Sequence, residues 1–171
     1  YPMFFGREQG RNRKGPAAPG FEVEHVLPDL TKKSIDYIRG RAAAAKSGQP
    51  FFLYLPLASP HTPIAPTKEW QGKSGLNSYG DFVMQTDWSI GEIMKALDAQ
   101  GLAANTLVII TSDNGCSPQA GFPELLAKGH NPNFVLRGHK ADIYEGGHRV
   151  PFLVRWPGRV AAGTQTNQTV C

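Results

Sequence analysis

The chain has 171 residues, with 18 Lys and Arg against 14 Asp and Glu, so its formal net charge at pH 7 is +4. Hydrophobic residues make up 40% and charged residues 19%, which fits a globular protein and excludes a disordered one. No apolar run approaches the about 18 residues of a membrane span, and two cysteines are too few for a disulfide framework. Basic residues cluster only near the start, among Gly and Pro, which indicates a solvated loop and no nucleic-acid partner.

The first part of the chain predicts a loop followed by a helix. Residues 1–28 are rich in Gly, Pro and charge and have no hydrophobic period, so we expect a loop-rich leading segment. Over residues 28–46 apolar residues recur at helical spacing, with Asp29 or Thr31 placed to cap the helix start. Gly48 follows as a stop signal.

Strand-sized apolar runs then alternate with a second helix. Residues 51–55 and 107–111 are continuous apolar runs, typical of strands covered on both faces, and 151–156 predicts a third strand. A helical period spans residues 79–101 and ends at a glycine. This order predicts an α/β fold over residues 29–160, a mostly parallel sheet flanked by helices, with ligands at the carboxyl ends of the strands.

Polar residues follow two of these predicted strands. Asp113 and Asn114, in the run 112–115, offer hard oxygen ligands for Ca²⁺ or Mg²⁺, although Asp-Asn-Gly is also what a simple tight turn prefers. His61 lies between Pro60 and Pro63, which either aim its imidazole at a site or hold it in an ordinary Pro-rich loop. The topology places both polar groups at one edge of the sheet.

A third polar cluster covers residues 137–151. It combines Lys, Arg and His with glycines, and Lys140 beside Gly138 is typical of an anion-binding surface. The alternative is a hairpin whose charges face the solvent.

Together these segments resemble the sulfatase family, the formylglycine-dependent, arylsulfatase-like enzymes of the alkaline phosphatase superfamily. The matching stretches are residues 50–63, 105–115 and 137–158, and the resemblance covers about residues 22–160 in the family's order. It implies an alkaline phosphatase/sulfatase-like α/β fold and a sulfuric ester hydrolase. The Gly-His-Lys-Ala-Asp-Ile stretch from 138 is similar to that of bacterial sulfatases that act on polysaccharides, which implies a sulfated carbohydrate as substrate.

The resemblance also implies roles for individual residues. Asp113 and Asn114 resemble two ligands of the divalent cation, usually Ca²⁺, with Mg²⁺ as the alternative. Lys140 resembles the lysine that binds the sulfate, and His61 the histidine that protonates the departing alcohol. His139 is either a contact to a sugar or second anionic group or a structural residue.

The family's nucleophile has no counterpart in this sequence. It is a formylglycine made from Cys or Ser in a Cys/Ser-x-Pro/Ala-x-Arg motif, and the nearest match, residues 116–120, has Ala120 where the motif has Arg. We therefore predict that residues 1–171 are an incomplete sulfatase catalytic domain, whose formylglycine lies in an upstream segment and which is inactive alone. The alternatives are a phosphate-ester hydrolase of the same superfamily and a noncatalytic binder of sulfated glycans. The resemblance implies a periplasmic or secreted protein and says nothing of an oligomer.

Overall fold

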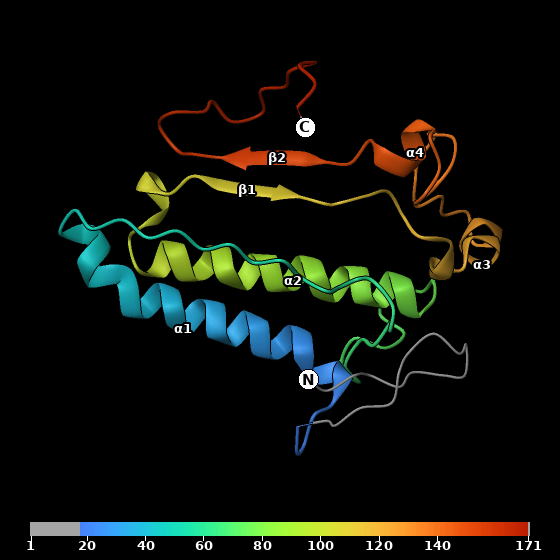
Figure 1. Cartoon of the computed structure of the whole chain (residues 1–171), viewed down its shortest axis with the longest axis horizontal. Coiled ribbons are helices and arrows are strands. Elements are labelled where there is room, and N and C mark those ends of the chain that lie inside the picture. The colour runs from blue at the N-terminus through green and yellow to red at the C-terminus, as the bar shows by residue number, and fades with distance from the viewer. Residues whose placement is uncertain (1–17, 171) are drawn as a thin grey trace.

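A computed structural model describes residues 18–170, so residues 1–17 of the loop predicted for 1–28 lie outside the described part. The end of that predicted loop is wrong, because a 3₁₀ turn forms at Val23–His25 and α1 begins at Val26. Two long helices and two short strands make up most of the regular structure (Figure 1). Three short 3₁₀ turns and two short helices complete it. In chain order the helices and strands are α1 (Val26–Lys46), α2 (Ser78–Ala99), β1 (Val108–Thr111), α3 (Phe122–Ala127), α4 (Glu145–His148) and β2 (Phe152–Arg155).

Both predicted long helices are confirmed, but only α2 begins with a side-chain cap. Asn77 caps α2, because its side-chain oxygen accepts hydrogen bonds from the backbone N–H groups of Tyr79 and Gly80 at 3.1 and 3.2 Å. The cap predicted for α1 is wrong. The Thr31 hydroxyl instead donates to the Leu27 carbonyl at 2.8 Å, one turn back inside the helix, so α1 begins without a side-chain cap.

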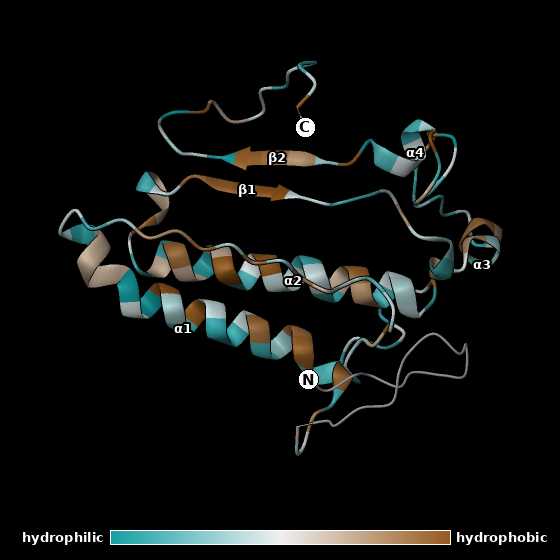
Figure 2. Cartoon of the chain, viewed as in Figure 1, coloured by the Kyte–Doolittle hydropathy of each residue, from teal (hydrophilic) through white to brown (hydrophobic). Residues whose placement is uncertain are grey.

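The core lies between the two long helices. Ile38 of α1 and Leu97 of α2 are almost fully buried, and β1 together with the segment 51–53 packs on the same cluster. Figure 2 shows hydrophobic residues along the facing sides of these helices and along both strands. The buried members of the cluster are Ile38, Ala42, Ala96, Leu97, Leu102 and Ala103.

The sheet corrects the predicted strand direction. β1 and β2 pair antiparallel, with Ile110 opposite Leu153, whereas we predicted a mostly parallel sheet. The pairing is antiparallel because the chain between them folds back on itself beyond the end of β1 (Figure 1). The run 51–55 forms no ladder within the described residues, but it passes over α2 in the same direction as β1.

Of the predicted strands, β1 and the run 51–55 are covered on one face, whereas Phe152, Leu153 and Val154 of β2 are all exposed. Burial alternates along β1 and along residues 51–57, so every second side chain faces the solvent. Phe52 and Tyr54 are 84% and 76% exposed, and Leu107 and Ile109 are about half exposed. Each of these two apolar runs therefore has one buried face and one exposed face, and the exposed side chains form an apolar surface. No helix in the described part of the chain has the length and hydropathy to cross a membrane.

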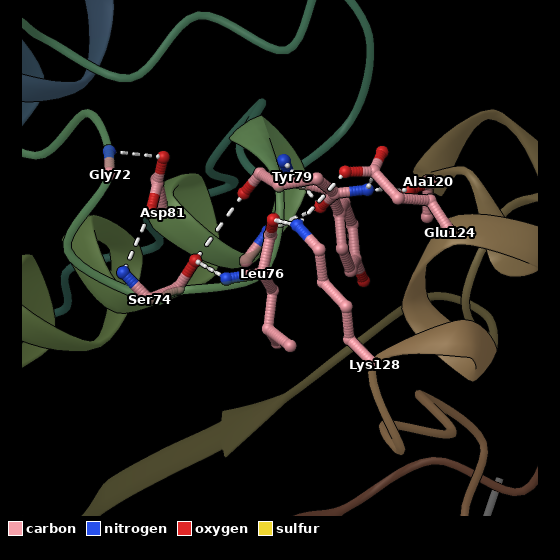
Figure 3. Close-up of polar contacts among 10 residues, drawn as sticks. Gly72, Ser74, Leu76, Tyr79, Asp81, Ala120, Glu124 and Lys128 are labelled. Atoms are coloured by element: carbon pink, nitrogen blue, oxygen red, sulfur yellow. Dashed lines mark hydrogen bonds and ion pairs between the residues drawn. The ribbon is translucent and has the colours of Figure 1, made fainter.

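A buried carboxylate fixes the loop before α2. Asp81, only 4% exposed, accepts hydrogen bonds from the backbone N–H groups of Gly72 and Ser74, both at 2.8 Å (Figure 3). Burial alone would raise the pKa of Asp81, but the hydrogen bonds from Ser74 and Gly72 outweigh it and hold that pKa below its usual value. The charged form is thus the one that the fold stabilises.

Replacing Asp81 by Asn is expected to lower the free energy of unfolding by about 3 kcal/mol, because the amide leaves one backbone donor unsatisfied. Since the folded pKa is depressed, the loss is expected to be constant above about pH 5 and to shrink below about pH 4, as the wild-type carboxylate is protonated. Urea unfolding across this pH range measures it. Asp87→Asn, at an exposed position of the same helix, is the control. Equal losses in the two variants would contradict this account.

Candidate functional site

Two loops that are distant in the sequence meet beyond the end of β1. Backbone hydrogen bonds at 2.9 Å join them, from the Gly115 N–H to the Gly147 carbonyl and from the Lys140 N–H to the Cys116 carbonyl. The first loop holds Asp113 and Asn114, and the second holds Lys140. We call these segments, residues 112–117 and 137–149, the two site loops.

Asn133 links the same loops through its side chain. Its Oδ1 accepts from the Cys116 N–H at 3.1 Å, and its Nδ2 donates to the Gly138 carbonyl at 2.7 Å. Asn133 is 9% exposed, so both bonds are shielded from water. Our sequence reading missed this residue, because a single Asn in a stretch without periodicity gives no signal of such a role.

Three glycines allow close backbone packing here, Gly115 between the two site loops and Gly146 and Gly147 within the second loop. A Cβ on Gly115 would lie 1.8 Å from the carbonyl oxygen of Gly146, and one on Gly146 would lie 2.2 Å from that of Gly138. A Cβ on Gly147 would lie 2.2 Å from the carbonyl oxygen of Asp142. Gly138 itself has φ +84°, a conformation that favours glycine. These glycines therefore pack backbone against backbone inside the protein.

Asp113 and Asn114 offer two oxygen ligands next to this crossing. The Asp113 side chain is exposed, and the Asn114 amide nitrogen donates to the Gly115 carbonyl at 3.1 Å, which fixes its position. The residue types fit a hard cation such as Ca²⁺, which takes about six to eight oxygen ligands. Between residues 18 and 170 no three His, Cys, Asp or Glu side chains gather as a metal site, so a cation here would need further ligands.

The Lys140 loop is held by its own residues. The Arg137 guanidinium lies over the ring of Tyr144, 3.7 Å from its centre. The Asp142 carboxylate accepts from the His139 backbone N–H at 2.9 Å and lies 3.3 Å from Nδ1 of the same histidine. This nearby carboxylate thus faces His139. Lys140 is half-buried, with its backbone fixed by Cys116.

His139 is engaged in contacts inside the protein. Besides Asp142, its Nδ1 lies 3.1 Å from the Lys140 carbonyl, and its ring centre is 5.7 Å from that of Phe122. The sequence left two roles open for His139, a substrate contact and a structural role, and these contacts favour the structural role. Its substrate contact remains a prediction.

His61 is exposed and has one ring nitrogen engaged. Nδ1 lies 2.7 Å from the Thr62 carbonyl and 3.2 Å from the Thr62 hydroxyl; since a carbonyl only accepts, Nδ1 is the nitrogen that carries the proton, and Nε2 has no hydrogen-bond partner within residues 18–170. The loop with His61 and the loop after β1 both leave toward the end of the molecule where α3 and α4 lie (Figure 1). Among the described residues no hydrogen bond or ion pair joins His61 to Asp113 or Lys140.

Cys116 is a half-buried thiol and not an activated one. Its Sγ donates to Tyr79 Oη at 3.2 Å, and burial raises the pKa of the Cys116 thiol above its usual value. Burial and the contact with Cys116 likewise raise the pKa of Tyr79. Both groups therefore stay neutral near pH 7.

We expect the Cys116 thiol, measured in a Cys171→Ser background, to react with a disulfide reagent clearly more slowly in the folded chain than in urea. Because its pKa is raised, the folded protein's rate is expected to rise with pH at higher pH than that of the unfolded chain. Stopped-flow absorbance at a series of pH values measures both. Equal folded and unfolded rates would show an accessible, unperturbed thiol.

Known proteins identify the family to which this arrangement belongs. The sulfatase family model matches residues 11–170. The chain belongs to the sulfatase family. This places it in the alkaline phosphatase-like superfamily and confirms the resemblance that the three sequence segments indicated.

Two curated relatives show how much of a sulfatase this chain spans. It is 39% identical over 145 residues to N-acetylgalactosamine-6-O-sulfatase of Bacteroides thetaiotaomicron, covering 83% of this chain and 27% of that protein. It is 41% identical over 119 residues to the steryl-sulfatase of Rattus norvegicus, covering 70% and 20%. The sulfatase chain thus spans less than a third of the length of these relatives.

Solved structures show the same fold. A structure from work on the metabolism of multiple glycosaminoglycans by Bacteroides thetaiotaomicron superposes with a TM-score of 0.73 at 39% identity, covering 82% of this sulfatase chain and 29% of that chain. The crystal structure of Ps i-CgsB in complex with k-i-k-neocarrahexaose superposes with a TM-score of 0.67 at 31% identity, covering 85% and 32%.

Proposed function

We propose that this chain is part of a sulfuric ester hydrolase that acts on a sulfated carbohydrate. The observation that carries the proposal is the pair of hydrogen bonds joining the two site loops, from Gly115 to Gly147 and from Lys140 to Cys116. They bring Asp113, Asn114 and Lys140 onto adjoining backbone, so that a cation held by the first two and the lysine ammonium would both attract a sulfate. The carbohydrate substrate is supported by relatives named for N-acetylgalactosamine sulfate and by a neighbour bound to neocarrahexaose.

In this proposal Asp113 and Asn114 hold a divalent cation, Ca²⁺ or Mg²⁺, together with ligands from outside the chain. The cation, when bound, would neutralise negative charge on the sulfate oxygens. The Asn114 amide nitrogen donates to Gly115, and its amide oxygen, which accepts no hydrogen bond within the described part of the chain, would bind the cation.

Lys140 and His61 supply the remaining charges. The Lys140 ammonium pairs with a sulfate oxygen and stabilises negative charge as the ester bond to sulfur breaks. His61, when protonated, carries its second proton on Nε2, because Nδ1 already donates to Thr62. In the proposal that proton goes to the departing alcohol oxygen. The nucleophile, a formylglycine in this proposal, comes from a segment outside this chain, and the whole protein is periplasmic or secreted.

The proposal is tested with two proteins, the 171-residue chain and a longer one that joins it to the coding sequence upstream of Tyr1. The isolated chain is expected to hydrolyse no 4-nitrophenyl sulfate, and the longer protein to hydrolyse it and to release sulfate from a sulfated galactosaminoglycan. Faster turnover of 4-nitrophenyl phosphate would show a phosphatase instead. Glycan binding without turnover by the longer protein would show a noncatalytic binder, and turnover by the isolated chain would contradict the missing nucleophile.

A further inference from the structure

An apolar cavity of about 190 Å³ opens directly beside His61. Its lining comes from the start of α1 and the residues before it, from the loop 58–63, and from Phe82 of α2. Most of these side chains are apolar, among them Phe21, Val26 and Leu30. The cavity has therefore an apolar floor and a rim that carries an imidazole.

The size of the cavity matches one six-membered ring. An apolar cavity of about 150 Å³ holds a benzene molecule, so this cavity of similar volume has room for one ring. Apolar lining stabilises the flat apolar face of a ring, whereas His61, Ser59 and Thr62 offer polar atoms to its substituents. Ser59 Oγ already accepts from the Thr86 hydroxyl at 2.9 Å, which fixes that part of the loop to α2.

We propose that this cavity binds the ring of the alcohol whose sulfate ester is cleaved. The inference rests on the proposed function, in which His61 protonates the departing alcohol oxygen. The ring is joined to this oxygen directly or through one carbon atom. It must therefore lie next to the imidazole, where the apolar cavity opens. Either a pyranose or an aromatic ring has the required flat face, and the test distinguishes them.

The loop segment gives the cavity a specific rim. Ala58 lines the cavity yet is exposed, so a larger side chain at this position narrows the opening without entering the core of the protein. Ala104, in a short 3₁₀ turn after α2, is also exposed and does not line the cavity, so the same substitution there is a matched control. Ala58→Phe and Ala104→Phe thus separate occlusion of the cavity from a general effect of an added phenyl ring.

The test is a titration followed by NMR, in the 171-residue chain, of the methyl groups of Val26, Leu27 and Leu30 and the backbone amide of Lys140. The probes are 4-nitrophenyl sulfate, galactose 6-sulfate and inorganic sulfate. Both esters are expected to shift the methyl signals and the Lys140 amide, whereas inorganic sulfate shifts Lys140 alone. Ala58→Phe is expected to weaken the binding of the preferred ester about tenfold or more and to leave inorganic sulfate unchanged. Ala104→Phe is expected to change neither.

The outcomes separate the cavity from the proposed function. Methyl signals that do not respond while Lys140 does, or an Ala58→Phe variant that binds the esters as the wild type does, would overturn the ring site and leave the proposed function standing. Methyl signals that respond to the esters while Lys140 stays unchanged would overturn the proposed function, and with it the assignment of this ring to a sulfate ester. The tighter of the two esters identifies the ring.

Discussion

Replacing Gly115 by Ala is expected to separate the two site loops. The added Cβ would lie 1.8 Å from the carbonyl oxygen and 2.8 Å from the carbonyl carbon of Gly146, and backbone atoms cannot swing aside as a flexible side chain does. To relieve this overlap the loops must part, which breaks the hydrogen bond from Gly115 to Gly147. We expect a loss of about 3 kcal/mol in the free energy of unfolding, at the upper end for overpacking.

Hydrogen exchange distinguishes this local effect from general destabilisation. In Gly115→Ala the backbone amides at positions 115 and 140 are expected to lose protection. The amides in the middle of α2 are expected to lose only as much protection as the drop in the free energy of unfolding requires. Gly91→Ala is the control, because Gly91 lies within α2 with open space around its Cα, and there alanine is expected to stabilise by about 1 kcal/mol. Wild-type stability and protection in Gly115→Ala would contradict the packing described here.

Replacing Lys140 by Ala is expected to lower kcat/KM for sulfate esters about 100- to 1,000-fold in an active sulfatase that contains this chain, because a preorganised positive charge is lost. The variant keeps the backbone N–H that donates to Cys116, so the two loops are expected to stay joined. The loss therefore reports the side chain alone.

The control for this variant is Lys68→Ala, which removes an exposed lysine from the loop before α2. It is expected to change kcat/KM less than about threefold, as a surface charge does. Steady-state kinetics with 4-nitrophenyl sulfate measures both variants. If Lys140→Ala keeps activity within the range of Lys68→Ala, Lys140 does not act on the sulfate.

The long helices and the site loops differed in how far the sequence predicted them. α1 and α2 follow from apolar residues at helical spacing, and the end of α2 near Gly101 follows from a glycine whose φ is +63°. Strand direction has no such local signal, since an apolar run such as 107–111 has the same sequence pattern in a parallel and in an antiparallel pair. The structure pairs it antiparallel with β2, against our prediction.

Within the candidate site, residue types were predictable and their connections were not. Asp113, Asn114 and Lys140 were predicted because their segments together resemble the sulfatase family; taken singly, the two segments fitted a tight turn and a solvent-facing hairpin equally well. The role of Asn133 depends on two backbone partners, Cys116 and Gly138, and it appears only when the chain is folded. Likewise α3 is a helix of six residues, too short to leave a hydrophobic period.

A paramagnetic cation tests the central claim most directly. Mn²⁺ prefers the same oxygen ligands as Ca²⁺ and Mg²⁺ and broadens NMR signals near its binding site. Adding Mn²⁺ to the 171-residue chain is expected to broaden the amide signals of Asp113 and Asn114 first and that of Lys140 next, with the effect lost in Asp113→Asn and kept in Asp87→Asn. Broadening that is no stronger at Asp113 than at Asp87, or that persists in Asp113→Asn, would contradict a cation site on the joined loops.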